Sequence, residues 1–406
     1  MSRSELPKDW RIASLEDVAD FINGYSFKST DWDISGLPII RIQNLNDGSK
    51  PFNRFSAEID EKYRVRSGDV LISWSASLGA YFWEGGDAWL NQHIFKAVIN
   101  ENTIDRDFFF WVMKNRIDKI AESARGSTMK HVTRKTFINS TIPLPPLPEQ
   151  RAIARALRAV QGAREARQRE VALEREHKAA LMEHLFTHGT RGEATKMTEI
   201  GEMPERWEIT KLGNISEISS GGTPSRDNQE YWNGNIPWVK TGEIHYNTII
   251  DTEEKITQKG LENLAAKTIP KGTLLMAMYG QGVTRGKVGL LGISATINQA
   301  CAAILVRNGF YTKFLFYYLE YSYERIRNFG HGANQKNLNL DLVRSITAPM
   351  PEISEQKEIA TILLACDSKI IALDHEARLL EELFRAMLEE LMRGRLQVRA
   401  LVENPA

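Results

Sequence analysis

The sequence predicts an α+β protein in which two tandem globular domains, each of mixed strands and helices, are separated by two long α-helices that form an antiparallel coiled coil. Three observations lead to this fold class: an internal duplication, a proline cluster at the same place in each copy, and a repeating apolar pattern after each cluster. At 406 residues the chain exceeds the size that a single hydrophobic core usually supports, which agrees with two or more domains.

The duplication has an offset of 206 residues, the difference between Pro143 and Pro349. PLPPLPEQRAIARAL, which begins at Pro143, and PMPEISEQKEIATIL, which begins at Pro349, are identical at seven of fifteen positions. Four earlier landmarks follow the same order in both halves: LPKDWRIASL with MPERWEITKL, SGDVLISW with KGTLLMAM, NQHIFKAVI with NQACAAILV, and GSTMKHV with GANQKNL. Five landmarks in one order indicate a duplicated unit of about 200 residues.

The globular domains are predicted at residues 1–145 and 196–350. Within them, short β-rich runs such as LPIIRIQNL, GDVLISW, IPWVKTGEI and GTLLMAMYG alternate with Gly, Asn and Asp turns. Helical patterns occur at residues 106–123 and 311–329. This mixture favours α+β domains.

Residues 146–195 and 351–406 are predicted to form the two long helices, each of about 35–40 residues. Steps of four and three residues from Ile359 meet only apolar side chains, whereas the same steps from Ile153 are interrupted in the middle by polar ones. Two such stripes in one chain can bury against each other, so we expect antiparallel pairing; generic oligomerisation is the alternative. The predicted seam is Ile153, Leu157, Val160, Val171, Leu181, Leu185, Ile359, Leu363, Ile370, Leu373, Leu380, Phe384, Met387 and Leu391.

The proline clusters are interpreted as joints between a domain and a helix. The prolines from Pro143 to Pro146 are expected to stop the strand region, and Pro148 or its neighbour to begin the helix. The Glu149-Gln150 pair and its copy, Glu355-Gln356, are assigned to helix initiation and to packing of the domain against the helix.

Composition restricts the class of protein only moderately. The formal net charge is zero, which neither requires nor excludes a nucleic-acid partner. Cys301 and Cys366 lie in apolar patterns and are expected to be core residues in a reducing compartment. No signal-peptide pattern and no apolar run long enough for a membrane span occur, so we expect a cytoplasmic protein without a membrane partner.

We predict no catalytic residues and no metal site. GQGVTRGK resembles a phosphate-binding loop, but its spacing is wrong. His184 and His188 are four residues apart, as zinc ligands can be, but no third ligand is evident. Glu355-Gln-Lys357 suggests part of a nuclease site, but its copy, Glu149-Gln-Arg151, favours a structural role in both halves.

Two polar segments, 124–137 and 325–340, are the first candidates for DNA contact, because they hold basic and amide side chains at the same place in each copy. Gly-rich loops with basic or aromatic residues are the others, and solvated loops without a ligand are the alternative. The candidate DNA-binding residues are Tyr25, Lys28, Arg41, Gln43, Asn44, Arg125, Ser127, Lys130, His131, Arg134, Lys135, Thr223, Ser225, Arg226, Lys240, Gln281, Arg285, Lys287, Asn334, Gln335, Lys336 and Asn337.

Over nearly its whole length the chain resembles the specificity subunit of type I restriction–modification enzymes. The second half carries the most specific motifs: SSGGTPSRDNQEYWNGNIPWVKTGEI, KGTLLMAMYG, INQACAAIL, GANQKNLNLDLV and the EQKEIA that follows the prolines. In the first half, NGYSFKS replaces the GGTPS loop and LPIIRIQNL replaces IPWVKTGEI. Such divergence is expected if the two halves read different DNA sequences.

The resemblance implies that residues 1–145 and 196–350 are target recognition domains, each of which reads one half of a bipartite sequence in double-stranded DNA. It implies that the coiled coil sets the separation of the domains and docks two methyltransferase subunits, which bind S-adenosylmethionine and methylate adenine N6. Restriction or translocase subunits would join through the complex and use ATP and Mg²⁺. No cofactor and no catalytic residue are implied for this chain.

Two other classes of function are weighed against this reading. A coiled-coil scaffold or adaptor that binds protein partners fits the zero net charge better. A stand-alone nuclease or NTPase is disfavoured by the missing motifs.

Because an α-helix rises 1.5 Å per residue, inserting about seven residues after Gln168 should lengthen the first long helix by roughly 10 Å. The unread spacer of the DNA target should then grow by about 3 base pairs. Sequencing of methylated sites measures the spacer, and an unchanged spacer in an active variant contradicts the role of the helix as a ruler.

Overall fold

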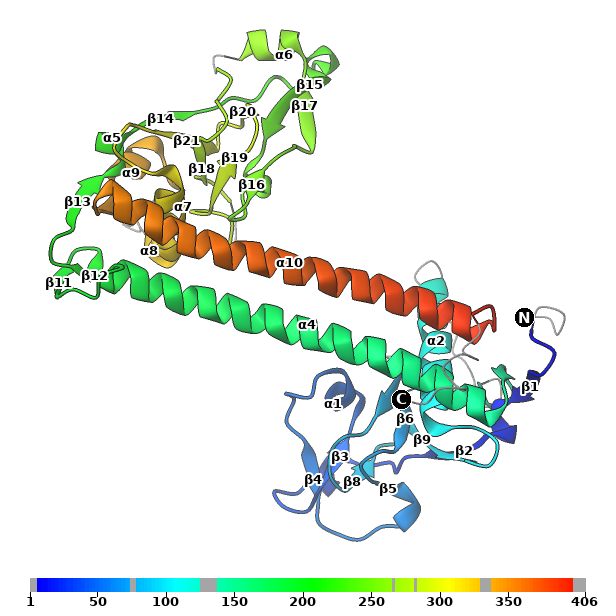
Figure 1. The fold of residues 1–406 in the computed structure, drawn as a ribbon. Coiled ribbons are helices and arrows are strands. Elements are labelled where there is room, and N and C mark those ends of the chain that lie inside the picture. Colours follow the sequence, from blue (N-terminus) through cyan, green and yellow to red (C-terminus); the bar gives the residue numbers. More distant parts are fainter. Residues whose placement is uncertain are drawn as a thin grey trace. The chain divides into compact units, whose positions relative to one another are not determined.

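The computed structural model describes residues 6–73, 78–124, 137–264, 267–280, 283–328 and 337–396 (Figure 1). The chain divides into two compact units. Unit 1 comprises Met1–Gln168 with His375–Ala406, and unit 2 comprises Arg169–Asp374. Each unit therefore holds one globular domain and about half of each long helix. Within the described residues, no helix is both long enough and apolar enough to span a membrane.

Unit 1 contains two four-stranded sheets and one two-stranded pair. One sheet, called the larger because its strands contain more residues, is antiparallel with the order β2-β9-β6-β7; the other, called the smaller, has the order β4-β3-β8-β5 with β3 and β8 parallel. The remaining pair, β1 with β10, joins the two ends of the domain. The strands are β1 (Arg11–Ser14), β2 (Ala19–Asn23), β3 (Leu37–Ile40), β4 (Asn53–Phe55), β5 (Arg64–Val65), β6 (Val70–Ser73), β7 (Gly79–Phe82), β8 (Ala88–Leu90), β9 (Ile94–Ile99) and β10 (Thr141–Leu144).

Unit 2 repeats this plan, but its larger sheet has one strand more, its smaller sheet has one strand fewer, and a hairpin is added. Its larger sheet has the order β14-β21-β18-β19-β16, its smaller sheet the order β17-β15-β20, and β13 pairs with β22 as β1 does with β10. The hairpin is β11 with β12. The strands are β11 (Thr195–Thr198), β12 (Gly201–Pro204), β13 (Glu208–Lys211), β14 (Ser216–Ser220), β15 (Trp232–Val239), β16 (Thr248–Ile249), β17 (Glu254–Ile256), β18 (Leu274–Ala277), β19 (Val288–Leu291), β20 (Thr296–Ile297), β21 (Cys301–Val306) and β22 (Thr347–Met350).

Helices α2 and α7 pack against the larger sheet of their domain and against the long helices, whereas α6 packs against β15 and β17 of the smaller sheet. In unit 1, α2 contributes Phe108 and Phe109 to a core that also contains Leu157 and Phe384 from the long helices. In unit 2 the corresponding core includes residues of α7. The domain helices are α1 (Ile42–Asn46), α2 (Arg106–Ala124), α5 (Leu212–Ile215), α6 (Gln258–Asn263), α7 (Thr312–Tyr321), α8 (Tyr323–Asn328) and α9 (Leu340–Ser345).

The structure departs from the predicted elements at several places. The run LPIIRIQNL is a strand only to Ile40 and then becomes α1, because the Asn44 side chain accepts a hydrogen bond from the Arg41 N–H at the helix start. The second helical pattern is divided at Ser322 into α7 and α8. Pro143 lies inside β10 and does not stop it, because a strand of a two-stranded sheet has an edge without ladder hydrogen bonds.

The two long helices are α4 (Leu147–His188) and α10 (Ile353–Met392), which are 42 and 40 residues long. Each stops before the end of the segment predicted for it. Gly189 and Gly394 follow the helices with φ angles of +68° each, the left-handed conformation that commonly ends a helix. The hairpin of β11 and β12 follows α4, and residues 397–406 lie outside the described residues.

Within each unit the long helices pair in antiparallel fashion, as predicted. In unit 1, Arg164 and Arg167 of α4 form ion pairs with Glu381 and Glu376 of α10, so rising numbers on one helix meet falling numbers on the other. In unit 2, Glu174 pairs with Lys369 at 2.7 Å and Lys178 with Asp367 at 2.7 Å. The four polar positions that interrupt the seam of α4 are therefore matched by opposite charges on α10.

The apolar seam positions are buried or half-buried throughout. The buried members are Ile153, Leu157, Val171, Leu185, Ile359, Leu363, Leu373, Phe384 and Leu391. The half-buried members are Val160, Leu181, Ile370, Leu380 and Met387. This exposure pattern confirms the predicted coiled-coil seam within each unit.

Each long helix begins with a glutamine that is buried in the preceding domain. Gln150 accepts a hydrogen bond from the N–H of Asp105 at 2.7 Å and donates to the carbonyl of Pro145 at 2.8 Å. Gln356 accepts from the N–H of Tyr311 at 2.8 Å and donates to the carbonyl of Pro351 at 2.9 Å. The same side chain thus ties the helix start to the loop before α2 or α7.

The glutamates of the two joints accept hydrogen bonds from equivalent tryptophans. The Trp10 indole N–H donates to Glu149 at 3.1 Å, and the Trp207 indole N–H donates to Glu355 at 3.1 Å. The Glu355 carboxylate is also paired with Arg206 and accepts from the Thr190 N–H at 3.1 Å. These contacts give the Glu-Gln pairs the structural role predicted from the sequence.

We expect Glu355→Ala to destabilise unit 2 by roughly 2–3 kcal/mol, because it leaves the buried Trp207 N–H without its acceptor and leaves Arg206 with Glu193 as its carboxylate partner in place of two. Glu149→Ala should destabilise unit 1 by about 1 kcal/mol, the typical value of one hydrogen bond. Urea unfolding with hydrogen exchange at β22 and β10 measures the two effects separately.

Glu352→Ala is the matched control, since Glu352 is exposed and forms only a long ion pair with Arg191 at 3.5 Å. Equal losses for Glu355→Ala and Glu352→Ala contradict a structural role for the buried carboxylate.

Candidate nucleic-acid interface

A basic side chain follows the same strand of the smaller sheet in both units. Arg41 comes directly after β3, and Lys240 comes directly after β15. The residue two positions before each cation pairs in register with the first residue of the neighbouring strand. Ile39 pairs with Asn53, and Trp238 pairs with Glu254. The two cations therefore occupy equivalent positions at the end of equivalent strands.

The backbone after each strand is fixed by the same local device. The Arg41 N–H donates to the Asn44 side chain at 3.2 Å, and the Lys240 N–H donates to the Glu243 carboxylate at 2.7 Å. A side-chain acceptor three residues on satisfies the first free N–H of a short helical turn.

In unit 1, Arg41 lines a hollow of about 360 Å³ together with Phe27, Trp32, Ile42, Gln43, Asn91, Gln92 and His93. Its Nη1 donates to the Asn53 side chain at 3.0 Å, and its guanidinium lies 5.4 Å from the centre of the Trp32 ring. The Trp32 side chain is 42% exposed, so an aromatic face and a guanidinium are accessible together.

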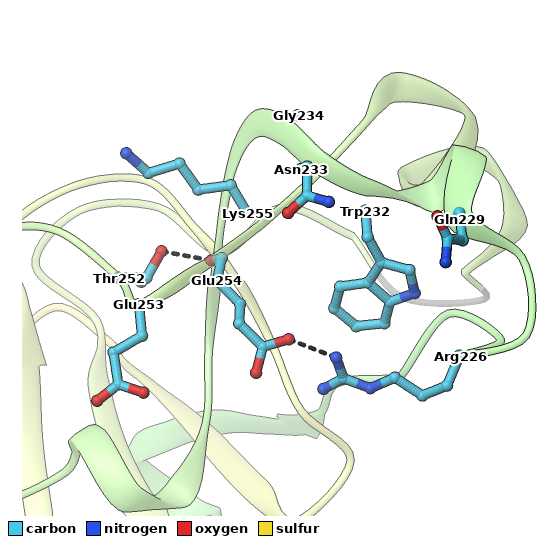
Figure 2. Close-up of a pocket in the computed structure, with 9 residues that line it drawn as sticks. All are labelled: Arg226, Gln229, Trp232, Asn233, Gly234, Thr252, Glu253, Glu254 and Lys255. Atoms are coloured by element: carbon cyan, nitrogen blue, oxygen red, sulfur yellow. Dashed lines mark hydrogen bonds and ion pairs between the residues drawn. The ribbon is translucent and has the colours of Figure 1, made fainter.

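In unit 2 the equivalent site contains two cations and two carboxylates. Lys240 Nζ lies 2.9 Å from a carboxylate oxygen of both Glu253 and Glu254. Arg226 forms an ion pair with Glu254 (Figure 2). Hydrogen bonds with Glu253 and Glu254 raise the pKa of the Lys240 ammonium. Hydrogen bonding from Arg226 and then Lys240 lowers the pKa of the Glu254 carboxyl, against the effect of its partial burial.

Arg226 lies close to two indole rings. Its guanidinium lies 3.8 Å from the centre of the Trp232 ring and 5.1 Å from that of Trp238. The indole N–H groups of both tryptophans donate to carbonyls of the loop that carries Arg226, to Ser225 at 3.0 Å and to Gly222 at 2.9 Å. The two tryptophans thus anchor the loop and present Arg226 at a hollow of about 540 Å³.

The other described candidates are distributed around these sites. Gln43 lines the hollow of unit 1, whereas Tyr25 contacts the rings of Phe27 and Tyr63, and Lys28 begins a short helical turn. In unit 2, Thr223 shares hydrogen bonds with Asn298 and Gln299. Ser225 and Asn337 are exposed, and Lys287 lies 5.7 Å from the ring centre of Tyr246.

Two candidates have structural roles. Asn44 is only 4% exposed, and its amide donates to the carbonyls of Lys50 and Pro51 at 3.1 and 3.3 Å, so its hydrogen-bonding groups are used within the domain. Arg285 is half-buried and donates to the carbonyl of Arg327. Both are better explained as positioning residues than as DNA contacts.

Several predicted residues lie outside the described part of the chain. The undescribed residues include 125–136 of the first polar segment and 329–336 of the second. The predicted residues among them are Arg125, Ser127, Lys130, His131, Arg134, Lys135, Gln281, Asn334, Gln335 and Lys336.

Sequence reasoning missed the partners of the cations. Trp32, Trp232, Asn53, Glu253 and Glu254 are not among the residues predicted to contact DNA. Trp32 lies five residues before Leu37 of LPII, and Trp232 lies four residues before Ile236 of IPWV; this similar spacing is a signal that could have paired the two tryptophans. The role of Asn53 and Glu254 follows only from the strand register.

Comparison with known proteins places the chain in one family. The family described as the type I restriction modification DNA specificity domain matches residues 7–175 and again residues 204–383. The specificity subunit of the type I restriction enzyme MjaVIII from Methanocaldococcus jannaschii is 25% identical over 98% of this chain and 95% of its own length. The EcoBI specificity subunit from Escherichia coli is 24% identical, with coverage of 98% and 88%.

Solved structures share the fold. The crystal structure of a type I restriction–modification S subunit from M. genitalium aligns with a TM-score of 0.62 and 16% identity, covering 95% of this chain and 98% of that one. A structure from work on complex assembly and conformational transition of the type I R-M system aligns with a TM-score of 0.56 and 18% identity, covering 96% and 99%. Since the family match covers most of both halves, the chain belongs to the type I restriction modification DNA specificity family and is the sequence-recognition subunit of such a system.

Proposed function

We propose that each globular domain reads one half of a bipartite DNA sequence, and that the sites around Arg41 and Lys240 make contacts with the DNA. The observation that carries this proposal is the recurrence of a basic residue, Arg41 or Lys240, at the same strand end in both units. Arg41 itself lines a hollow and lies near the Trp32 ring. Lys240 shares the Glu254 carboxylate with Arg226, which lines the hollow of unit 2 and lies near the Trp232 ring. A coiled-coil adaptor is not favoured, because both halves match a DNA specificity domain.

In unit 1 the positive charge of Arg41 is not neutralised by its hydrogen-bond partner Asn53. Asn53 is a neutral partner for Arg41 and accepts from only one of its terminal nitrogens in the contact at 3.0 Å. A guanidinium has further donors in a fixed fork, which suits either a phosphate or the O6 and N7 acceptors of guanine. We therefore assign a net positive contact to this site.

In unit 2 the cations are already paired with carboxylates. DNA that displaces Glu254 from Arg226 or Lys240 would free a cation for a phosphate or a guanine, and would free a carboxylate to accept from the amino group of cytosine. Paired cations are also held in place before DNA arrives, because Arg226 rests on the Trp232 ring. The two domains would then read different half-sites from the same structural position.

The partners and chemistry of the complex follow from the family as proposals. The duplicated chain carries each surface twice, which suits two copies of one methyltransferase subunit. Those subunits would bind S-adenosylmethionine and methylate adenine N6, and restriction or translocase subunits would supply ATP- and Mg²⁺-dependent steps. This chain would act without a cofactor and without catalytic residues of its own, in the cytoplasm.

Arg41→Gln should weaken recognition of one half-site, and Lys240→Gln should weaken recognition of the other. If the side chain contacts a base, discrimination at one position should fall by about 1–3 kcal/mol; if it contacts a phosphate, all sequences should lose affinity and the salt dependence should flatten by a slope of about 1. Binding of the methyltransferase complex to randomised half-sites at several salt concentrations measures both quantities.

The control variants are Arg11→Gln and Lys211→Gln, because both residues are exposed on the two-stranded pairs of their domains and line neither hollow. Unchanged binding in Arg41→Gln and Lys240→Gln, or equal losses in the controls, would exclude these sites as the DNA contacts.

Exchange of residues 196–350 for the corresponding segment of a relative should alter one half-site and leave the other unchanged. Single-molecule sequencing of methylated adenines, in hosts with and without the gene, gives both half-sites directly. Changes in both half-sites contradict independent reading, and methylation that persists without the gene contradicts the function itself.

A further inference from the structure

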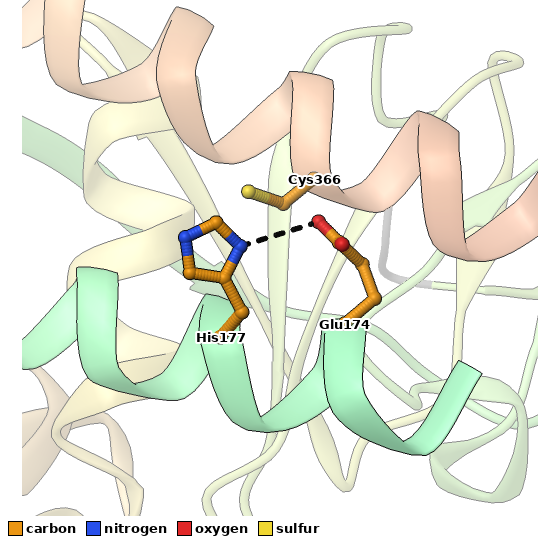
Figure 3. Close-up of side chains that lie close together, drawn as sticks. All are labelled: Glu174, His177 and Cys366. Atoms are coloured by element: carbon orange, nitrogen blue, oxygen red, sulfur yellow. Dashed lines mark ion pairs between the residues drawn. The ribbon is translucent and has the colours of Figure 1, made fainter. Parts of the chain in front are cut away.

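Three residues with metal-ligating side chains meet between the long helices of unit 2. Glu174 and His177 lie one turn apart on α4, and Cys366 faces them from α10 (Figure 3). A carboxylate oxygen, a ring nitrogen and the thiol sulfur all lie within 4.8 Å of one another. The sequence analysis predicted no metal site and placed Cys366 only as a core residue.

The duplication provides an internal comparison for this cluster. The equivalent residues of the other half lie 206 positions away in the sequence. Val160 is equivalent to Cys366, Leu380 to Glu174 and Leu383 to His177. Unit 1 therefore has three aliphatic side chains where unit 2 has three potential ligands. Generic packing of a coiled coil is satisfied by aliphatic residues at these positions, so it does not require the polar trio.

The known contacts of the cluster leave ligand atoms available. Lys369 donates to one carboxylate oxygen of Glu174 at 2.7 Å, and the other oxygen lies 3.6 Å from Nδ1 of His177. The hydrogen bond from Lys369 lowers the pKa of the Glu174 carboxyl, so that group is charged. Because a metal ion binds the thiolate form of cysteine, binding would release the proton of the Cys366 thiol.

The geometry is close to what a tetrahedral ion needs. Zinc bonds of roughly 2.0–2.3 Å place neighbouring ligand atoms about 3.5 Å apart, so the widest separation must close by about 1 Å. The His177 side chain is 59% exposed and can rotate to provide that movement, whereas Glu174 and Cys366 are held in the seam. The exposed side leaves room for water as the fourth ligand.

We propose that Glu174, His177 and Cys366 bind a divalent metal ion of the zinc class, which links α4 to α10 within unit 2. Mixed carboxylate, imidazole and thiolate ligands favour such an ion over Mg²⁺ or Ca²⁺, which prefer oxygen ligands. The Lys369 ammonium competes with the metal ion for the Glu174 carboxylate, so we expect the site to bind the ion with moderate affinity. This site is independent of the DNA contacts proposed above.

Titration of the chelator-treated full-length chain with Co²⁺ tests the proposal through the near-ultraviolet charge-transfer band of a cobalt–thiolate bond. We expect one equivalent per chain, displaceable by Zn²⁺. The band reports Cys366, because the only other cysteine, Cys301, is 0% exposed in the core of the domain. Cys366→Val should abolish the band, and His177→Leu should weaken binding roughly tenfold or more.

These variants copy the residues of unit 1, Val160 and Leu383, and are therefore expected to preserve the fold, which circular dichroism checks. Lys369→Met should tighten binding, because it removes the competitor for Glu174; a purely structural cluster gives no such gain. His184→Gln is the matched control on the same helix. Zn²⁺ should also raise the thermal unfolding midpoint of the wild type and not of Cys366→Val.

Absence of the charge-transfer band overturns the proposal. So does Co²⁺ binding that survives Cys366→Val and His177→Leu but is lost in His184→Gln, which would place the ion at the stacked pair of His184 and His188.

Discussion

The buried hydrogen bonds at the start of each long helix are the constraint on which each unit depends. Apolar contacts between a domain and a helix tolerate small rotations, but Gln150 and Gln356 must meet a particular N–H and a particular carbonyl at 2.7–2.9 Å. A buried amide that loses its hydrogen-bond partners destabilises the fold by more free energy than the hydrogen bonds contribute when formed. The joint therefore has one favoured geometry. The glutamates beside them lock the same joint to Trp10 or Trp207. Each domain is thereby fixed to the helix that leaves it.

The charged residues in the seam of the coiled coil determine which helix α4 pairs with. A helix with ten apolar seam residues, such as α10, could pair with many partners, but α4 carries Arg164, Arg167 and Lys178 at seam positions. Two copies of α4 would bring such charges together without the carboxylates Glu381, Glu376 and Asp367 that α10 supplies. Unpaired charges at a helix interface are costly, so the polar stretch selects the pairing of α4 with α10.

Much of the fold could be predicted because its strongest signals are local. The long helices can be predicted from heptad-like spacing and prolines, and the duplication from repeated sequence segments. None of these signals requires knowledge of a distant contact. The candidate sites could be predicted only in part. Arg41 and Lys240 were found as basic residues in loops, but their partners Asn53 and Glu254 depend on strand register, which residue type does not reveal. Residue type could not separate the two roles open to Asn44, because an amide suits base recognition and buried capping equally well; its hydrogen bonds within the domain favour capping.

The duplication also shows where the two halves have been free to differ. The joint is chemically the same in both, since Trp, Glu and Gln recur with the same hydrogen bonds. The strand-end cation recurs as well, whereas its partner changes from a neutral amide, Asn53, to a carboxylate, Glu254. Exchanging the partner alters the charge of the site without moving the cation or the backbone that presents it. A change of this kind alters what the hollow can bind while the fold that supports it stays intact, which is the physical requirement for two related domains to recognise different sequences.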